Sequence, residues 1–260
     1  MIRSKKHIAQ LLKIKYKDLV ALLDNTDNYY YEKKIEKKDE NGKTKINEKG
    51  EIEYRVLYPS KDLLKDKQDL IKKRVLDNLE LPKFVHGGVK GRSNISNAMI
   101  HKGNKYFFQT DIKKFFPSIR HYQVYDMFIR NEFSPDVAKI LTRLTTHNGR
   151  LPQGTPTSPG LSNLVFCLVD KEIAEFCSLH NLTFTRFVDD IAISSKKCFR
   201  EKSSSIIEII TEAGYTISRK KTYYKIGPTD ITGVSVHNNF LTTTKEFSES
   251  FAKVLSLIHI

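Results

Sequence analysis

The stretch Thr185-Arg186-Phe187-Val188-Asp189-Asp190-Ile191-Ala192-Ile193-Ser194 decides how the rest of the chain is interpreted. Its aromatic and branched apolar residues favour β-strands, whereas two adjacent Asp residues favour a turn. The pattern predicts a β-hairpin with two carboxylates at its tip. Adjacent carboxylates raise one another's pKa unless a cation compensates them, and Mg²⁺ prefers carboxylate oxygen. An ordinary polar turn could contain the same residues, so the rest of the chain must decide between a metal-binding hairpin and such a turn.

The composition indicates a globular protein with a polyanionic partner. The 260 residues allow one large domain or two small ones, and 15 Phe and 12 Tyr can supply a sizeable core. Lys and Arg number 44 against 30 Asp and Glu, which gives a formal net charge of +14. Such an excess favours binding to nucleic acid, although a merely soluble basic surface is the alternative.

The cysteines and apolar runs bear on the cellular location. Cys167, Cys177 and Cys198 show neither metal-ligand spacing nor an even disulfide framework, which is typical of a reducing compartment. No apolar run approaches about 18 residues, and the basic N-terminus is not followed by an apolar segment. We therefore expect a cytoplasmic protein with no membrane partner.

A second acidic position lies upstream of the Asp pair. Residues 107–111 read as a buried strand that ends in Asp111, and two aromatic residues and a proline follow it. Three carboxylates on adjacent strands would hold two divalent ions, and such a site stabilises the attacking and leaving oxygens of an in-line phosphoryl displacement. Together with the basic surface, this pattern suggests nucleotidyl transfer on nucleic acid.

Periodicity and turn residues place the remaining elements. Ser158 is a natural N-cap with Pro159 at the first helical position, so a long helix is expected to start there. Residues 32–54 are polar and Gly-containing, which predicts a hairpin or loop insertion. Further helices are expected at 4–24, 60–79, 121–132, 135–146, 199–213 and 244–258, and further strands at 214–218, 223–226 and 231–236.

A Gly-rich basic loop occupies residues 86–93. Such a loop can bring backbone N–H groups close to phosphates, and Lys90 and Arg92 add positive charge. Asn97 and His101 follow at a spacing of four on an expected short helix. A plain connecting loop would look similar.

The motifs together resemble those of reverse transcriptases, in the same order and through most of the chain. The matching segments are residues 108–116 (first catalytic motif), 151–163 (nucleotide-pocket motif), 187–190 (aromatic-X-Asp-Asp hairpin), 214–222 (the following motif) and 231–233 (primer-gripping hairpin). Within the family, Asn97-Ala98-Met99-Ile100-His101 and Ile231-Thr232-Gly233 are similar to elements of the bacterial retron branch. Other defence-associated and group II intron reverse transcriptases share the core motifs.

The resemblance implies an α+β fold with the fingers and palm of a right-hand polymerase, in which helices back an antiparallel palm sheet. Residues 1–104 would form an N-terminal helix and fingers, with further fingers elements at about 121–150. Residues 105–227 would form the palm, and residues 228–260 the primer-grip hairpin and the start of a thumb. The family continues into a helical thumb, whereas one short helix follows here, so the thumb is expected to be reduced or missing.

The resemblance also assigns the catalytic groups. Asp111 and Asp189 would hold two Mg²⁺ ions, with Asp190 as a further acid and the backbone carbonyl of Ile112 as an additional ligand. Lys221 would neutralise or protonate the departing pyrophosphate, with Lys220 as its rival and a solvated basic turn as the alternative. Phe-Val stands where Tyr-Ala is commoner before the two acids, and this change keeps the aromatic residue.

Other residues would contact the substrates. Phe116 occupies the position that resembles the sugar gate, where a bulky ring selects deoxynucleotides; a core aromatic is the alternative. Gln153 and Arg55 would contact the incoming dNTP. Lys90 and Arg92 would bind triphosphate or RNA, and Asn97 and His101 would contact structured RNA or order the junction between fingers and palm.

The implied function is RNA-directed DNA synthesis of the retron type. A dedicated structured noncoding RNA would serve as template and primer, DNA would be the product, and a separate effector protein would act with it in antiphage defence. Three alternatives stay open: a defence-associated reverse transcriptase of another branch with different priming, RNA synthesis on the same fold, and a catalytically idle RNA-binding scaffold. Phe116 argues against RNA synthesis. A metal-dependent nuclease would have no role for the Pro-Gln-Gly loop.

Overall fold

The computed structural model describes residues 4–39, 42–47, 49–238 and 240–243. The chain forms two compact units. The first contains Met1–Glu80 and Phe116–Val165, and the second contains Leu81–Phe115 and Phe166–Ile260. Each unit is therefore built from two separate segments of the sequence.

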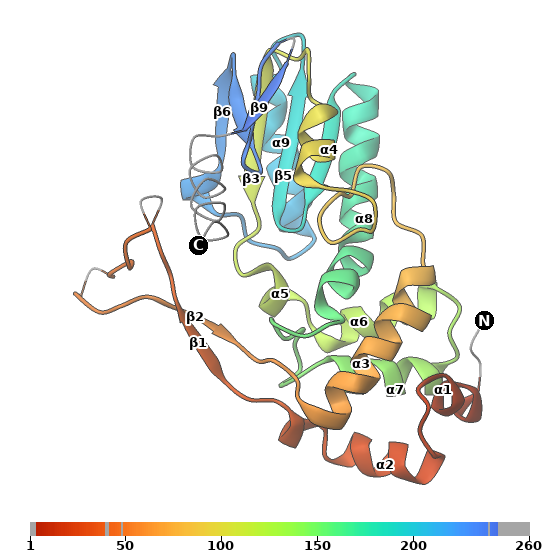
Figure 1. The fold of residues 1–260 in the computed structure, drawn as a ribbon. Helices are drawn as coiled ribbons and strands as arrows, with labels where there is room; N and C mark the ends of the chain where they lie inside the picture. The colour runs from red at the N-terminus through yellow and green to blue at the C-terminus, as the bar shows by residue number, and fades with distance from the viewer. Residues whose placement is uncertain (1–3, 40–41, 48, 239, 244–260) are drawn as a thin grey trace, which may run out of the picture. The chain divides into compact units, whose positions relative to one another are not determined.

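The first unit is mainly helical (Figure 1). Its helices are α1 (Lys5–Leu11), α2 (Tyr16–Asp24), α3 (Asp62–Arg74), α5 (Phe115–Ser118, whose first residue belongs to the second unit), α6 (His121–Arg130) and α7 (Pro135–Thr145), with short 3₁₀ turns at Thr26–Tyr29 and Leu76–Asn78. The single helix expected at 4–24 is wrong. Lys13 adopts a positive φ of 50° between α1 and α2, which a continuous right-handed helix cannot contain.

The helices α6 and α7 confirm the two helices expected after residue 120. Ser134 caps α7 by accepting a hydrogen bond from the Val137 amide, and Pro135 occupies its first turn. The two helices bury apolar faces that include Met127 and Phe128 on α6 and Leu141 and Leu144 on α7. This burial fixes the faces that the pair leaves to solvent.

A two-stranded hairpin, β1 (Lys33–Glu36) and β2 (Tyr54–Leu57), also belongs to the first unit. The strands are antiparallel, with Ile35 opposite Arg55. Nearly all of their residues are exposed. The insertion predicted from the polar composition of residues 32–54 is thus a solvent-exposed hairpin.

The second unit is organised around a four-stranded antiparallel sheet in the order β4-β5-β3-β6. Its strands are β4 (Thr183–Phe187), β5 (Asp190–Ser195), β3 (Tyr106–Asp111) and β6 (Tyr223–Ile226). Neither β3 nor β5 has an exposed residue, and most of their residues are buried, as in a sheet that is covered on both faces.

Helices and a second sheet cover the two faces. One cover is the C-terminal half of α8 (Ser158–Leu179) together with α9 (Ser203–Glu212), where Phe115, Phe166 and Tyr215 form an aromatic cluster with ring centroids 4.8–6.3 Å apart. On the opposite side lie α4 (Asn94–Met99) and the three-stranded sheet β7 (Thr229–Ile231), β8 (Val234–Val236) and β9 (Leu241–Thr243) (Figure 1). Their shared core contains Ala98, Phe107, Ala192, Ile231, Val234 and Val236.

Two further elements were expected in the C-terminal part of the chain, a strand and a helix. The strand expected at 214–218 is wrong, because this segment makes only an isolated bridge between Ile112 and Ile217. The helix expected at 244–258 lies outside the described residues. Within the described residues, no helix is both long and apolar enough to cross a membrane.

Candidate active site

Three carboxylates converge at one end of the four-stranded sheet. Asp111 ends β3 and stands opposite Asp190, the first residue of β5, while Asp189 lies in the turn before β5. One carboxylate oxygen from each of the three residues lies within 4.8 Å of the others. Antiparallel register therefore brings Asp111 to the Asp189-Asp190 pair, which lies almost 80 positions later in the sequence.

The mutual repulsion of these acids appears in the pKa of Asp190. Burial, first of all, and the neighbouring charges of Asp189 and Asp111 together raise this pKa to about 6, against the opposing charge of Lys221. Such a site holds more negative charge than the protein itself compensates, and a divalent cation with a preference for oxygen would balance it.

Lys221 lies among the acids, on a short 3₁₀ turn at Arg219–Lys221. Its Nζ donates a hydrogen bond of 2.5 Å to Asp111 Oδ2. Partial burial would lower the pKa of Lys221, but this bond and the charges of Asp111, Asp190 and Asp189 raise it overall. Its neighbour Lys220 forms no ion pair with these acids in the described part of the chain, so the geometry favours Lys221 over its rival.

The turn that presents Asp189 has an unusual backbone. Val188 has a φ of +58°, a region that favours Gly or Asn and is strained for a β-branched residue. Gly87 packs directly against it, since a Cβ at Gly87 would lie 2.4 Å from the Val188 amide nitrogen. Hydrogen bonds of 2.8 Å between the backbones of residues 84–86 and Arg186 hold the two segments together. The Gly-rich loop thus contributes to the shape of the turn.

A buried arginine supports the same turn from inside. The Arg186 guanidinium donates hydrogen bonds of 2.7 and 2.6 Å to the two carboxylate oxygens of Asp170, and one of 2.7 Å to the Val188 carbonyl. Both charged side chains are fully buried. Arg186 therefore links α8 to the residue that precedes Asp189.

Sequence reasoning missed Arg186, Asp170 and Gly87 as parts of the site. A signal was available, because a charged residue in an otherwise apolar strand is rarely buried without a partner. The partner could not be identified from one sequence, since Asp170 lies on a helix whose other polar residues look the same.

The predicted nucleotide-binding residues other than Ile112 lie in the first unit. Phe116 is half-buried on α5, and Gln153 and Arg55 are exposed or half-buried. The Tyr58 amide donates a 2.9 Å hydrogen bond to the Gln153 carbonyl, so the Pro-Gln-Gly loop is joined to the end of the strand that contains Arg55. The nearby Arg150 guanidinium donates to the Pro117 carbonyl at 2.7 Å, which ties the same loop to α5.

Ile112 is joined to the acids by its backbone. Its side chain is fully buried, and its amide donates a 3.0 Å hydrogen bond to the Asp189 carbonyl. The bond fixes the end of β3 against the turn.

The loop residues predicted to contact phosphate differ in their surroundings. Lys90 is exposed. Arg92, in contrast, donates hydrogen bonds to the carbonyls of Pro82 and Val85, both at 2.5 Å, and its guanidinium also approaches the Leu81 carbonyl. Arg92 is thus occupied in folding its own loop, at odds with a direct phosphate or RNA contact.

Asn97 and His101 are buried, which is at odds with the predicted contacts to RNA. His101 is fully buried between Ser194 and Thr185, with hydrogen bonds of 2.6 and 2.7 Å to their hydroxyls. Burial lowers its pKa to about 3, so the ring is neutral. Asn97 donates to the Thr232 hydroxyl at 3.3 Å. These bonds join α4 to the turn between β7 and β8, and the residues just after α4 to β4 and β5, which supports an ordering role instead.

Comparison with known sequences identifies the family. The sequence model described as "Reverse transcriptase (RNA-dependent DNA polymerase)" matches residues 35–237, which include every acid of the site. The chain belongs to the reverse transcriptase family. Its curated relatives include retron Se72 reverse transcriptase of Salmonella heidelberg (34% identical over 60% of this chain) and retron Ec86 reverse transcriptase of Escherichia coli (31% over 68%). These similarities confirm the resemblance to retron-type reverse transcriptases.

The matches cover only part of each relative. They cover 42% of the Se72 and 56% of the Ec86 reverse transcriptase, so the chain spans about half the length of these relatives. Among solved structures, telomerase from Candida albicans, in complex with a TWJ fragment of telomeric RNA, aligns over 87% of this chain and 50% of that chain. The TM-score is 0.52 at 8% sequence identity. This likeness shows a polymerase fold of mixed helices and antiparallel sheets.

Proposed function

We propose that the chain is an RNA-directed DNA polymerase of retron type that copies a dedicated structured noncoding RNA into DNA. The observation that carries the proposal is the cluster of Asp111, Asp189 and Asp190 with Lys221, in a chain that belongs to the reverse transcriptase family. The activity, substrates and partners below are all parts of this proposal.

The donor set fits divalent metal ions. Three carboxylates and one ammonium leave about two negative charges uncompensated, and hard oxygen donors of this kind suit Mg²⁺. Asp111, Asp189 and Asp190 would hold two ions, with the Ile112 carbonyl as a further ligand. Bound Mg²⁺ would activate the primer hydroxyl and neutralise charge on the triphosphate.

The remaining groups would position substrate and move charge. The Lys221 ammonium, held beside Asp111, would neutralise or protonate the departing pyrophosphate. The Phe116 ring would exclude a ribose 2′-OH and so select deoxynucleotides. Gln153 and Arg55 would contact the dNTP, and exposed Lys90 would contact phosphate.

We propose that the first unit is the fingers and the second the palm. The β7–β9 sheet would then be the primer grip, and residues 81–104 would belong with the palm.

The proposed partners are nucleic acids and one protein. A structured noncoding RNA would be the template and, through one of its own 2′-OH groups, the primer. The product would be DNA, and the system would act in antiphage defence with a separate effector. A formal net charge of +14 supports phosphate-dominated RNA binding that weakens steeply with salt.

The test is incorporation of radiolabelled dNTPs in Mg²⁺, comparing RNA that co-purifies with the protein against a generic primed RNA template. We expect label on the co-purified RNA, in a branched linkage, and none with the double variant Asp189→Ala, Asp190→Ala. Activity on the generic template alone would favour a reverse transcriptase of another branch. RNA binding without incorporation on either template would favour an idle scaffold.

A further inference from the structure

A groove in the first unit lies between α6 and α7, away from the acids in sequence and in a different unit. It encloses about 510 Å³. Its principal lining side chains are His121, Tyr122 and Tyr125 from α6 and Lys139, Thr142 and Arg143 from α7. Thr142 and Arg143 lie three and four positions after Lys139, so the three residues share one face of α7.

The lining combines aromatic rings with cations and contains no carboxylate. Tyr122 is 56% exposed, so part of its aromatic ring is open to solvent. Lys139 is exposed and makes no hydrogen bond or ion pair with the residues that the structure describes. Thr142 is buried there, and its hydroxyl has no partner among the same residues.

Arg143 differs from Lys139, because it is already engaged. Its guanidinium pairs with Asp27 at 2.9 Å and also donates to the Leu23 carbonyl at 3.2 Å. Lys139 is therefore the cation in this groove that a ligand can recruit without breaking an existing ion pair.

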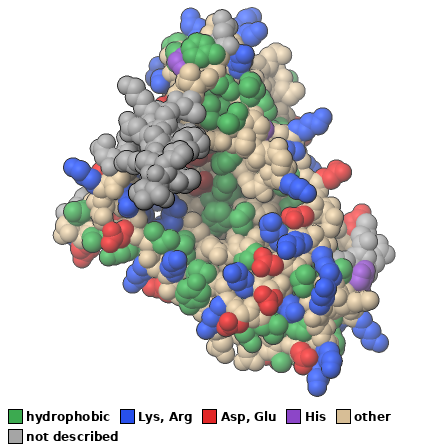
Figure 2. Space-filling model, in the orientation of Figure 1, with side chains coloured by type: hydrophobic (Ala, Val, Ile, Leu, Met, Phe, Trp, Pro, Cys, Tyr) green, Lys and Arg blue, Asp and Glu red, His purple; other side chains and the backbone are tan. Residues whose placement is uncertain are grey.

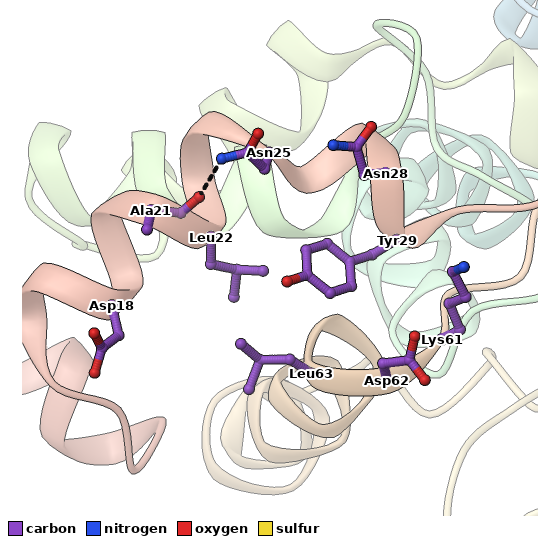
Figure 3. Close-up of a pocket in the computed structure, with 9 residues that line it drawn as sticks. All are labelled: Asp18, Ala21, Leu22, Asn25, Asn28, Tyr29, Lys61, Asp62 and Leu63. Carbon is purple, nitrogen blue, oxygen red and sulfur yellow. Dashed lines mark hydrogen bonds between the residues drawn. The ribbon is translucent and has the colours of Figure 1, made fainter.

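A second groove of the same unit provides a contrast. It encloses about 480 Å³, and Figure 3 shows Leu22, Leu63 and Tyr29 at its centre with Asp18 and Asp62 at its margin. Two acids and one lysine, Lys61, give this groove no preference for a polyanion. Along α3, Lys and Arg are interspersed with Asp, and the lower part of the surface in Figure 2 shows the same mixture of basic and acidic side chains. The α6–α7 groove thus stands out by its chemistry and not by its size.

We propose that the α6–α7 groove binds unpaired nucleotides of an RNA strand, with a base stacked on Tyr122 and a phosphate at Lys139. Bases stack on aromatic side chains, and cations beside the rings follow the phosphates, so this combination is the one used for single-stranded nucleic acid. A double helix presents no free base face to a tyrosine. The inference rests on the proposed function in one respect, namely that RNA is the polyanion this chain handles.

The matched variants are two double substitutions in the same unit. Tyr122→Ala with Lys139→Ala removes the ring and the free cation from the groove. Tyr16→Ala with Lys17→Ala makes the same two changes on α2, where Tyr16 is 45% exposed and neither residue lines either of the two grooves described above. All four side chains are exposed, so both variants are expected to unfold at the same temperature as the parent protein within about 2 °C.

The measurement is fluorescence anisotropy of a labelled single-stranded RNA of about 12 nucleotides, without dNTPs and with EDTA present. We expect the groove variant to bind about tenfold more weakly or worse, and the α2 variant to bind within about twofold of the parent protein. For a hairpin RNA of the same composition, the groove variant should lose much less affinity relative to the parent protein. Photocrosslinking of 4-thiouridine RNA should label the peptide that contains Tyr122.

Three outcomes would overturn the proposal: equal losses in both variants, equal losses for single-stranded and hairpin RNA, or a crosslink elsewhere with none at the α6–α7 groove. An equal loss for single-stranded DNA would overturn the assignment to RNA. Because the assay contains no dNTPs, its result does not depend on polymerase activity. Failure of the incorporation test would leave this binding result intact, and the two proposals can fail separately.

Discussion

The chain contains two antiparallel hairpins that differ in almost every physical respect. The β1–β2 hairpin is exposed along both strands, and its strands are joined through residues 37–53. The β4–β5 hairpin is buried on both strands and turns through only Val188 and Asp189. An ion pair accompanies each: exposed Lys37–Glu53 at 2.9 Å, and fully buried Arg186–Asp170 at 2.6 Å. Only the second arrangement fixes a carboxylate in one position.

The two hairpins differ in what holds their turns and ends in place. Backbone pairing is present in both hairpins, so pairing alone does not distinguish them. The difference lies in Arg186 beneath the turn and Gly87 beside it, which hold the strained Val188 in place. Strain of this kind persists only where the surrounding structure determines it.

The largest effect is expected at the buried ion pair. Asp170→Ala should lower the free energy of unfolding by about 3–5 kcal/mol, because it leaves the Arg186 guanidinium buried without its carboxylate. Urea denaturation measures this. A loss below about 1 kcal/mol would mean that solvent reaches Arg186. The Arg186–Asp170 ion pair would then not be what distinguishes this hairpin.

The next effect is expected at the close contact beside the turn. Gly87→Ala places a methyl group 2.4 Å from the Val188 amide nitrogen, so one of the two segments must move. We expect a loss of about 1–3 kcal/mol in stability and a larger fractional loss of dNTP incorporation. Gly91→Ala is the control for general loop effects, since a Cβ there meets nothing within 4 Å, although its φ of +77° carries its own strain. Equal behaviour of the two variants would refute the proposed contact.

A smaller effect is expected from pH. The pKa of Asp190 is about 6 in the folded protein and near 4 when unfolded, so the folded state binds more protons between these values. Its contribution therefore destabilises the metal-free protein above pH 6, and the penalty is relieved as pH falls toward 4. Asp190→Asn removes this charge, so it should raise the free energy of unfolding by up to about 2 kcal/mol at pH 7.5 and by much less at pH 4.5.

This comparison uses the difference between the variant and the parent protein at each pH, so that other carboxylates cancel. Thermal unfolding in EDTA at both pH values provides the measurement. A gain that is equal at the two pH values would show that the charge of Asp190 is not its source.

The smallest effect is expected at the exposed hairpin. Glu53→Ala should change the free energy of unfolding by no more than about 0.5 kcal/mol, because the Lys37–Glu53 pair is solvated and screened. Denaturation in low and high salt checks it. A loss approaching that of Asp170→Ala would remove the contrast between the hairpins.

The sequence predicted the elements that depend on local signals. The Asp pair between apolar runs predicted the β4–β5 hairpin, and Ser134-Pro135 predicted the start of α7, because turn and cap chemistry are encoded in adjacent residues. The order of the motifs also predicted that Asp111 would lie beside Asp189 and Asp190. These features need no knowledge of distant contacts.

The rest depended on tertiary context. Contacts to RNA were one expectation for Asn97 and His101, with an ordering role as the alternative, and Arg92 was expected to bind triphosphate or RNA. In the structure, His101 binds hydroxyls of Ser194 and Thr185 that are distant in sequence, and Arg92 binds backbone carbonyls of its own loop. The strand expected at 214–218 failed because only Ile217 finds a bridge partner. Propensity cannot report which neighbours a segment will meet.

The strand order β4-β5-β3-β6 has a consequence for synthesis on the ribosome. β3 is central in the sheet but is made first, so both of its edges stay unpaired until β5 and β6 emerge. Almost 80 residues separate the end of β3 from the start of β5, which takes roughly 4–16 seconds at typical elongation rates, and β6 is made later still. An unpaired apolar strand such as residues 106–111 is a template for aggregation during that interval. We expect arrested nascent chains that end near residue 180 to be protease-sensitive across β3, and chains that expose residue 226 outside the ribosome to be protected there.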